Sequence, residues 1–183
     1  LTTTAQQALA TAQREAMGRQ HPEVTGLHVL AALAQEKGGA VVSILGKAGA
    51  DAARVAQVVE SELARIPTTS SGAGSTGREV MELLARAEQE SKTLKDSYVS
   101  TEHLLLAIAG VRGKARDVLE TLGVERSHLA DAIAQLRKSS GVETVTDQNA
   151  EANYEALKKY SVDLTEKAQQ GKLYPVIGRD EEI

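Results

Sequence analysis

The sequence predicts an all-α fold of eight helices, built as two four-helix halves related by a pseudo-two-fold axis. Three observations predict it: the sequence repeats itself internally, apolar residues recur at three- and four-residue spacing, and aromatic residues are scarce. Only 2% of the 183 residues are aromatic, all of them Tyr. A core of Ala, Leu, Val and Ile without Phe or Trp favours packed helices over sheet.

The repeat becomes visible when the chain is shifted against itself by about 75 residues. Leu9 then aligns with Leu84, and His28 aligns with His103. After a slip of one position the match continues, with Val59 on Ile133. The repeats cover about residues 1–66 and 76–137. Because neither half carries enough apolar residues for a core of its own, we expect the two to pack as one unit.

Helix-ending and helix-capping residues divide the first half into four predicted helices. Pro22 ends the opening helix, because proline disfavours helical backbone in the residue before it. Thr25 is the expected N-cap of a second helix, which the Gly38-Gly39 pair ends. The third helix closes at Gly49, where glycine tolerates left-handed backbone, and Asp51 caps the fourth.

The second half repeats this order. Val80 to Ala87 forms the face of its first helix, and Ser100 caps the second, with Glu102 favourably placed near the helix N-terminus. A third helix ends at Gly123, and the fourth carries apolar residues at three- and four-residue spacing.

Two segments between these units have the composition of flexible linkers. Residues 67–77 are rich in Gly, Ser and Thr, and residues 138–149 have no helical stripe. The predicted organisation is therefore a repeat domain over residues 1–137, a linker over 138–149 and a further segment over 150–183. Both ends read as cut, since the chain opens on Leu1 and closes in a charged run.

The charge balance and the absence of cysteine argue against several classes of partner and site. Twenty-one basic against 25 acidic residues give a formal net charge of −4, with no basic cluster, which argues against nucleic acid and a membrane surface as partners. No apolar run approaches the length of a membrane helix. The absence of cysteine excludes a thiolate metal site and a Cys nucleophile, and fits the cytoplasm.

No nucleotide-binding or hydrolase motif in the sequence predicts a catalytic site. Residues 72–77 match the pattern G-x-G-x-x-G, but no strand precedes them, so we interpret them as linker. The sequence contains neither a G-x-x-x-x-G-K-[ST] phosphate loop nor a G-x-S-x-G elbow. We therefore expect no enzymatic activity from this chain itself.

The titratable side chains fit structural roles better than catalytic ones. His28 and His103 occupy equivalent positions early in the second helix of each half, and we interpret both as rings that cap or pack a helix start. No metal-ligand spacing accompanies them. We expect the remaining candidates to be exposed: His21, His128, Glu88, Glu90, Asp96 and Glu102.

What remains is a binding surface. A cleft between the two halves, rimmed by Asp96 and Glu102 and floored by aliphatic residues near Val99, is suited to an extended apolar segment of another protein.

The motif Val99-Ser-Thr-Glu-His-Leu-Leu-Leu-Ala107 in a duplicated eight-helix unit resembles the Clp N-terminal repeat domain family. The segment from Ala156 to Leu173, followed by Pro175-Val-Ile-Gly-Arg-Asp-Glu-Glu-Ile183, resembles the start of the first ATPase domain in the ClpB family of bacterial protein disaggregases. Three departures from the family pattern stand on the expected groove: Arg86, Glu90 and His103. Tyr174 and Ala5 depart elsewhere, at positions of an expected Asp and Phe.

The resemblance implies a parent protein that is a homohexameric AAA+ chaperone of the stress response. It would use ATP and Mg²⁺ to thread aggregated polypeptides, and would meet the DnaK chaperone system through a coiled-coil middle domain absent from this chain. Residues 150–183 would be the truncated start of its first nucleotide-binding domain. Pro175, Val176, Ile177 and Gly178 would supply partial adenine contacts, too few to bind nucleotide alone. The fragment itself is expected to be a monomer without a cofactor.

For the repeat domain the resemblance implies recruitment of unfolded or aggregated polypeptide. By alignment the substrate-binding positions are Thr2, Asp96, Val99, Glu102 and His103. Apolar burial at about 25 cal/mol per Å² would drive binding, and the two acidic residues would disfavour acidic segments. The alternative is an N-domain that docks a folded adaptor in a protease-coupled Clp unfoldase, which a salt-sensitive one-to-one complex would reveal.

Overall fold

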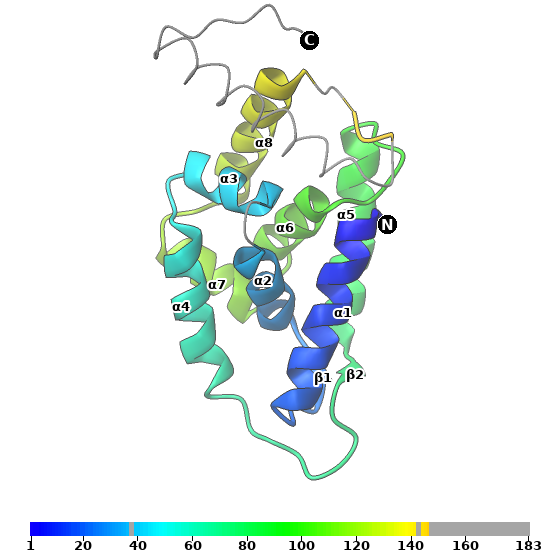
Figure 1. The fold of residues 1–183 in the computed structure, drawn as a ribbon, viewed down its shortest axis with the longest axis vertical. Helices are drawn as coiled ribbons and strands as arrows, with labels where there is room; N and C mark the ends of the chain where they lie inside the picture. The colour runs from blue at the N-terminus through cyan, green and yellow to red at the C-terminus, as the bar shows by residue number, and fades with distance from the viewer. Residues whose placement is uncertain (37–38, 142–143, 147–183) are drawn as a thin grey trace, which may run out of the picture.

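The computed structural model describes residues 1–36, 39–141 and 144–146, and in this part of the chain eight helices confirm the predicted all-α class (Figure 1). A strand pair of two residues each is the addition that the sequence did not predict. In chain order the elements are α1 Thr3–Gly18, β1 Glu23–Val24, α2 Gly26–Gln35, α3 Ala40–Lys47, α4 Ala52–Leu63, β2 Ser75–Thr76, α5 Arg78–Thr93, α6 Thr101–Gly110, α7 Lys114–Thr121 and α8 Arg126–Ser140.

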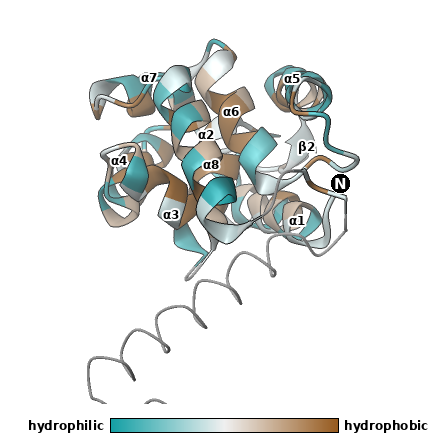
Figure 2. Cartoon of the chain, turned by 90° about the horizontal axis from the view of Figure 1, so that it is seen from above, coloured by the Kyte–Doolittle hydropathy of each residue, from teal (hydrophilic) through white to brown (hydrophobic). Residues whose placement is uncertain are grey.

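The two halves interlock rather than lie side by side. Helix α3 of the first half packs against α8 of the second, and α4 packs against α7. The apolar helices α2 and α6 lie at the centre, where α6 contacts all of α1, α2, α3, α5, α7 and α8 (Figure 2). One apolar core therefore draws on both repeats, as expected for halves that cannot fold apart.

Local signals place the helix ends as predicted. The side chain of Asp51 accepts from the backbone N–H of Ala53 at 3.1 Å and caps α4. Thr25 caps α2, with its backbone N–H donated to the Nδ1 of His28 at 2.9 Å. Gly49 and Gly123 close α3 and α7 with φ values of 97° and 80°, in the left-handed region that favours glycine.

Backbone hydrogen bonds join the two halves at two equivalent places. In β1 and β2, Val24 pairs with Thr76 in parallel register. At the equivalent place in the repeat, the N–H of Thr2 donates to the carbonyl of Val99 at 2.9 Å. The segment before each half's first helix thus bonds to the segment after the other half's first helix.

The segment 67–77 is docked, contrary to the plain linker that its composition predicted. The N–H of Thr69 donates to the carbonyl of Gln20 at 2.7 Å, and that of Gly74 donates to His21 at 2.9 Å. Gly74 also packs close to the side chain of Met17. Composition alone missed these bonds because their partners lie about 50 residues away in the chain.

The second predicted linker begins later than expected. Helix α8 continues to Ser140, so residues 138–140 are helical, and Gly141 ends it with a φ of 71°. Val145 is fully buried. Residues 142–143 and 147–149 of that linker, and the segment 150–183 with Pro175, Val176, Ile177 and Gly178, lie outside the described residues.

Within the described residues no single helix is long and apolar enough to cross a membrane. Helices α2 and α3 meet the length and composition criteria only as a pair, with a 97° bend between them.

Candidate functional site

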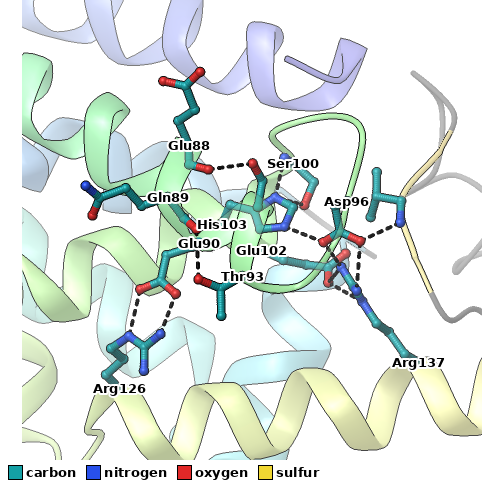
Figure 3. A network of polar contacts seen from close by, with 12 residues as sticks. Glu88, Gln89, Glu90, Thr93, Asp96, Ser100, Glu102, His103, Arg126 and Arg137 are labelled. Atoms are coloured by element: carbon teal, nitrogen blue, oxygen red, sulfur yellow. Dashed lines mark hydrogen bonds and ion pairs between the residues drawn. The ribbon is translucent and has the colours of Figure 1, made fainter.

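A buried ion-pair network joins the loop between α5 and α6 to the end of α8 (Figure 3). The guanidinium of Arg137 donates to Asp96 at 3.1 and 2.8 Å and to Glu102 at 3.1 and 2.9 Å. The side chains of Asp96 and Glu102 have no exposed surface, and that of Arg137 is 8% exposed. One cation thus holds two buried carboxylates, an arrangement that is costly to break from either side.

His103 completes this network from the first turn of α6. Its Nδ1 accepts the backbone N–H of Ser100 at 2.8 Å, and its Nε2 lies 2.6 Å from Asp96. With Nδ1 occupied as an acceptor, Nε2 carries the N–H that points at the carboxylate. The predicted capping role of His103 is confirmed, as is that of His28 in α2.

The chain beyond α8 also reaches Asp96. The backbone N–H of Val145 donates to Oδ1 of Asp96 at 2.7 Å, and its carbonyl accepts from the N–H of Ser97 at 2.7 Å. Burial opposes ionisation of Asp96, but donors from His103, Arg137 and Val145 outweigh it and hold its pKa below the usual value. Asp96 is therefore a fixed anion that organises three separate segments.

The structure corrects the predicted placement of the binding residues. Thr2, Glu102 and His103 have no exposed surface, and the side chain of Asp96 is likewise enclosed. Thr2 caps α1 by accepting the N–H of Ala5 at 3.1 Å. None of these four lies on the rim of an open cleft.

Val99 is half-buried and packs against the core. The predicted acid-rimmed groove is wrong in geometry, because the sequence did not reveal that Arg137 would neutralise both acids from 35 or more residues away.

The first repeat fills the equivalent positions differently. His21 stands where Asp96 stands, and its Nδ1 lies 2.8 Å from the Nε2 of His28. His21 is only 3% exposed, which corrects its prediction as a surface residue. Burial, with the neighbouring His21, lowers the pKa of His28 to about 4, so this pair is neutral near pH 7.

A second ion-pair cluster also corrects an exposed carboxylate. Glu90 is 3% exposed and pairs with Arg126 at the start of α8 and with Arg86 at 3.2 Å. Burial opposes its ionisation, yet the bonds from Arg126 and Arg86 keep the pKa of Glu90 below its usual value. The Arg86 guanidinium also lies close to Gly110 of α6. Glu88, by contrast, is exposed as predicted.

An apolar groove of about 520 Å³ lies beside the network, between α8 and the end of α5. Its lining residues are Leu94, Ala130, Ile133, Ala134, Arg137, Lys138 and Gly141. Arg137 offers the groove mostly its aliphatic stem, because its charged end is engaged by Asp96 and Glu102. Sequence reasoning missed the groove, although the spacing of Ala130, Ile133 and Ala134 marks an apolar stripe on α8.

No metal or nucleotide site is assembled by the described residues. Among them, no group of three or more His, Asp or Glu side chains is placed to hold a metal ion. The sequence offers no phosphate loop, and the predicted adenine contacts lie outside the described part. The described side chains therefore offer no site that would hold ATP.

Residues 1–122 match the family model of the Clp repeat (R) N-terminal domain. The chain belongs to the Clp repeat N-terminal domain family. It is 41% identical over its whole length to the chaperone protein ClpB of Rhodopirellula baltica, of which it spans 20%. This likeness confirms the predicted relationship to the N-terminal region of ClpB.

Solved structures agree with the family assignment. The Hsp104 N-terminal domain from Candida albicans superposes with a TM-score of 0.72 at 20% identity, covering 82% of this chain and 98% of that one. A ClpV N-domain solved in complex with a VipB peptide gives a TM-score of 0.60 at 26% identity, covering 73% of this chain and 84% of that one. The first likeness shows the fold, and the second extends to a domain with a peptide in complex.

Proposed function

We propose that this chain recruits unfolded or aggregated polypeptide for a ClpB-type disaggregase, by binding and without catalysis. The apolar groove between α8 and the end of α5 carries the proposal. Leu94 and Ile133 line it, and the neutralised Arg137 leaves little charge to desolvate when an apolar segment enters. The ATP and Mg²⁺ of a ClpB-type protein would act in parts of the longer chain.

Weak individual affinity is compatible with this role. A groove of about 520 Å³ accommodates a few side chains, whose burial contributes about 25 cal/mol per Å² before the costs of association. In a hexamer several such domains would face one aggregate, and their combined binding would exceed that of a single groove. The hexamer, the DnaK partnership and the cytosolic location remain predictions.

The charge preference differs from the one that the sequence suggested. Asp96 and Glu102 are enclosed and paired, whereas Lys138 stands exposed at the groove edge. We therefore expect apolar segments with acidic flanks to bind better than those with basic flanks.

One experiment tests the groove directly. The isotopically labelled chain is titrated with reduced, carboxymethylated α-lactalbumin as a permanently unfolded probe, and amide shifts are followed by NMR. We expect shifts at Leu94 and along α8. Ala134→Glu, at an exposed groove position, should abolish them, whereas Gln135→Glu, an exposed neighbour outside the groove, should not. Equal binding by both variants, or no shifts at all, would reject the groove.

Docking of one defined segment of a partner is the second candidate function. The ClpV N-domain in complex with a VipB peptide favours it, since a related domain there accompanies a particular peptide. The unfolded probe separates the two functions. A recruiting domain binds many unrelated unfolded sequences with similar affinity, whereas a docking domain ignores them and forms a one-to-one complex with one partner.

A further inference from the structure

Residues 144–146 are held on the body of the domain in the way a peptide ligand is held. Val145 donates its N–H to Asp96 and accepts the N–H of Ser97, both at 2.7 Å, and its side chain is fully buried. The domain thus satisfies both backbone groups of Val145 and encloses its side chain. Peptide ligands are recognised by the same two elements, hydrogen bonds to the backbone and burial of a side chain.

The contact is directly connected to the groove. Gly141, which ends α8 with a φ of 71°, lines the groove. Arg137 lines the same groove and binds the Asp96 carboxylate that receives the Val145 N–H. Leu94, two positions before Asp96, forms the opposite wall. The groove, Arg137, Asp96 and Val145 therefore form one continuous path of contacts.

We infer that residues 144–146 are an intramolecular ligand that competes with client polypeptide for the end of this groove. The inference rests on the proposed function and adds its regulation. An extended apolar client segment takes over the bonds to Asp96 and Ser97 as it enters, and the chain beyond α8 is released.

The tether makes such competition effective without strong contacts. Few residues separate Gly141 from Val145, so the effective concentration of the segment at its site is in the millimolar range. Two hydrogen bonds and one buried valine suffice to keep it bound most of the time under those conditions. Client affinity is then reduced by the fraction of domains in which the site is open.

The test uses the whole chain and the carboxymethylated α-lactalbumin probe, labelled for fluorescence anisotropy. Val145→Asp places a carboxylate beside Asp96 and expels the segment. We expect this variant to bind the probe about tenfold more tightly than the unsubstituted chain. Thr146→Asp adds the same charge at the exposed next position and should leave the affinity unchanged.

A second readout follows the contact itself. Hydrogen exchange at the Ser97 amide should accelerate in Val145→Asp and not in Thr146→Asp, because only the first loses the carbonyl acceptor. Accelerated exchange with unchanged probe affinity would overturn the inferred competition, but it would not contradict binding of the probe in the groove. If neither the unsubstituted chain nor Val145→Asp binds the probe, recruitment itself fails, and the competition fails with it.

Discussion

Arg137 of α8 donates to both carboxylate oxygens of Asp96, at 3.1 and 2.8 Å, across 41 residues of sequence. The same guanidinium holds Glu102. The acidic pair that the sequence pattern marked as a substrate contact is thus an internal strut that fixes the α5–α6 loop to α8. Because Arg137 also lines the groove, this strut fixes one wall of the groove.

Removing the cation should destabilise the domain strongly. Arg137→Leu leaves two buried carboxylates without their common partner, and we expect a loss of about 3–5 kcal/mol in the free energy of unfolding. Urea denaturation followed by circular dichroism measures it. Arg65→Leu is the matched control, since Arg65 is 72% exposed and pairs with Glu62 at 3.5 Å; it should change stability by less than about 1 kcal/mol. Similar losses in both variants would refute the strut.

The first repeat supplies a design for replacing the network. Asp96, Glu102 and Arg137 align with His21, Leu27 and Leu63, all buried. The triple variant Asp96→His, Glu102→Leu, Arg137→Leu should therefore fold with a stability within about 1 kcal/mol of the original, although Arg137→Leu alone does not. The same urea titration decides it. A triple variant as unstable as the single one would mean that the repeats are not interchangeable here.

Mild acid should lower the free energy of unfolding of the domain, because His28 becomes protonated more readily in the unfolded chain. Its pKa is about 4 in the folded state against 6.5 when unfolded, so the unfolded chain binds more protons between these values. The His28 contribution is complete above pH 6.5 and is lost as the pH falls toward 4, by about 3 kcal/mol. Denaturation at pH 7, 6, 5 and 4.5 measures the slope.

The variant His28→Gln isolates that contribution. Glutamine at this position preserves the capping box of α2 but does not titrate. Its stability should fall less steeply between pH 6.5 and 4.5 than that of the unsubstituted chain. Asp96 and Glu90, whose pKa values are held low, add their own losses only at lower pH. Parallel slopes would rule out His28 as the titrating group.

Two glycines of the α3 region should respond in opposite directions to alanine. Gly46 lies inside the helix with open space around its Cβ position, so Gly46→Ala should stabilise by about 1 kcal/mol. Gly49 follows the helix at a φ of 97°, where a side chain is strained, so Gly49→Ala should destabilise by about 1 kcal/mol. Melting temperatures of the pair test this, and shifts of equal sign would contradict the assigned end of α3.

The groove should select clients by flanking charge. Lys138→Glu is expected to reduce, by several-fold, the affinity for an apolar peptide with acidic flanks, and to improve binding of one with basic flanks. Lys114→Glu, an exposed substitution on α7 away from the groove lining, is the control and should alter neither. Calorimetric titration at low and high salt checks both, and a preference insensitive to Lys138 would remove its role.

Much of the fold was readable from the sequence because its signals are local. Thr25, Asp51 and Gly49 mark helix ends through bonds or backbone angles that involve only a few neighbouring residues. The repeat that aligns His28 with His103 foretold a pseudo-symmetric pair of four-helix units and the capping role of both rings.

The candidate site was less predictable, because burial and ion pairing are set by partners distant in sequence. No local sequence pattern shows that Arg137 binds Asp96 or that Arg126 binds Glu90. Nor does any local pattern show that Val145 donates a hydrogen bond to the α5–α6 loop. Acidic residues on a helix are usually solvated. This expectation was wrong where a cation from α8 offsets the free-energy cost of burying the carboxylate.

By itself, the sequence determined the helical class, the duplication and most of the helix ends, since hydrophobic periodicity and capping act over a few residues. Only the tertiary structure decided which acids are exposed and where an apolar groove opens. Those properties depend on how α8 crosses to the α5–α6 loop, and so on contacts between residues that are dozens of positions apart.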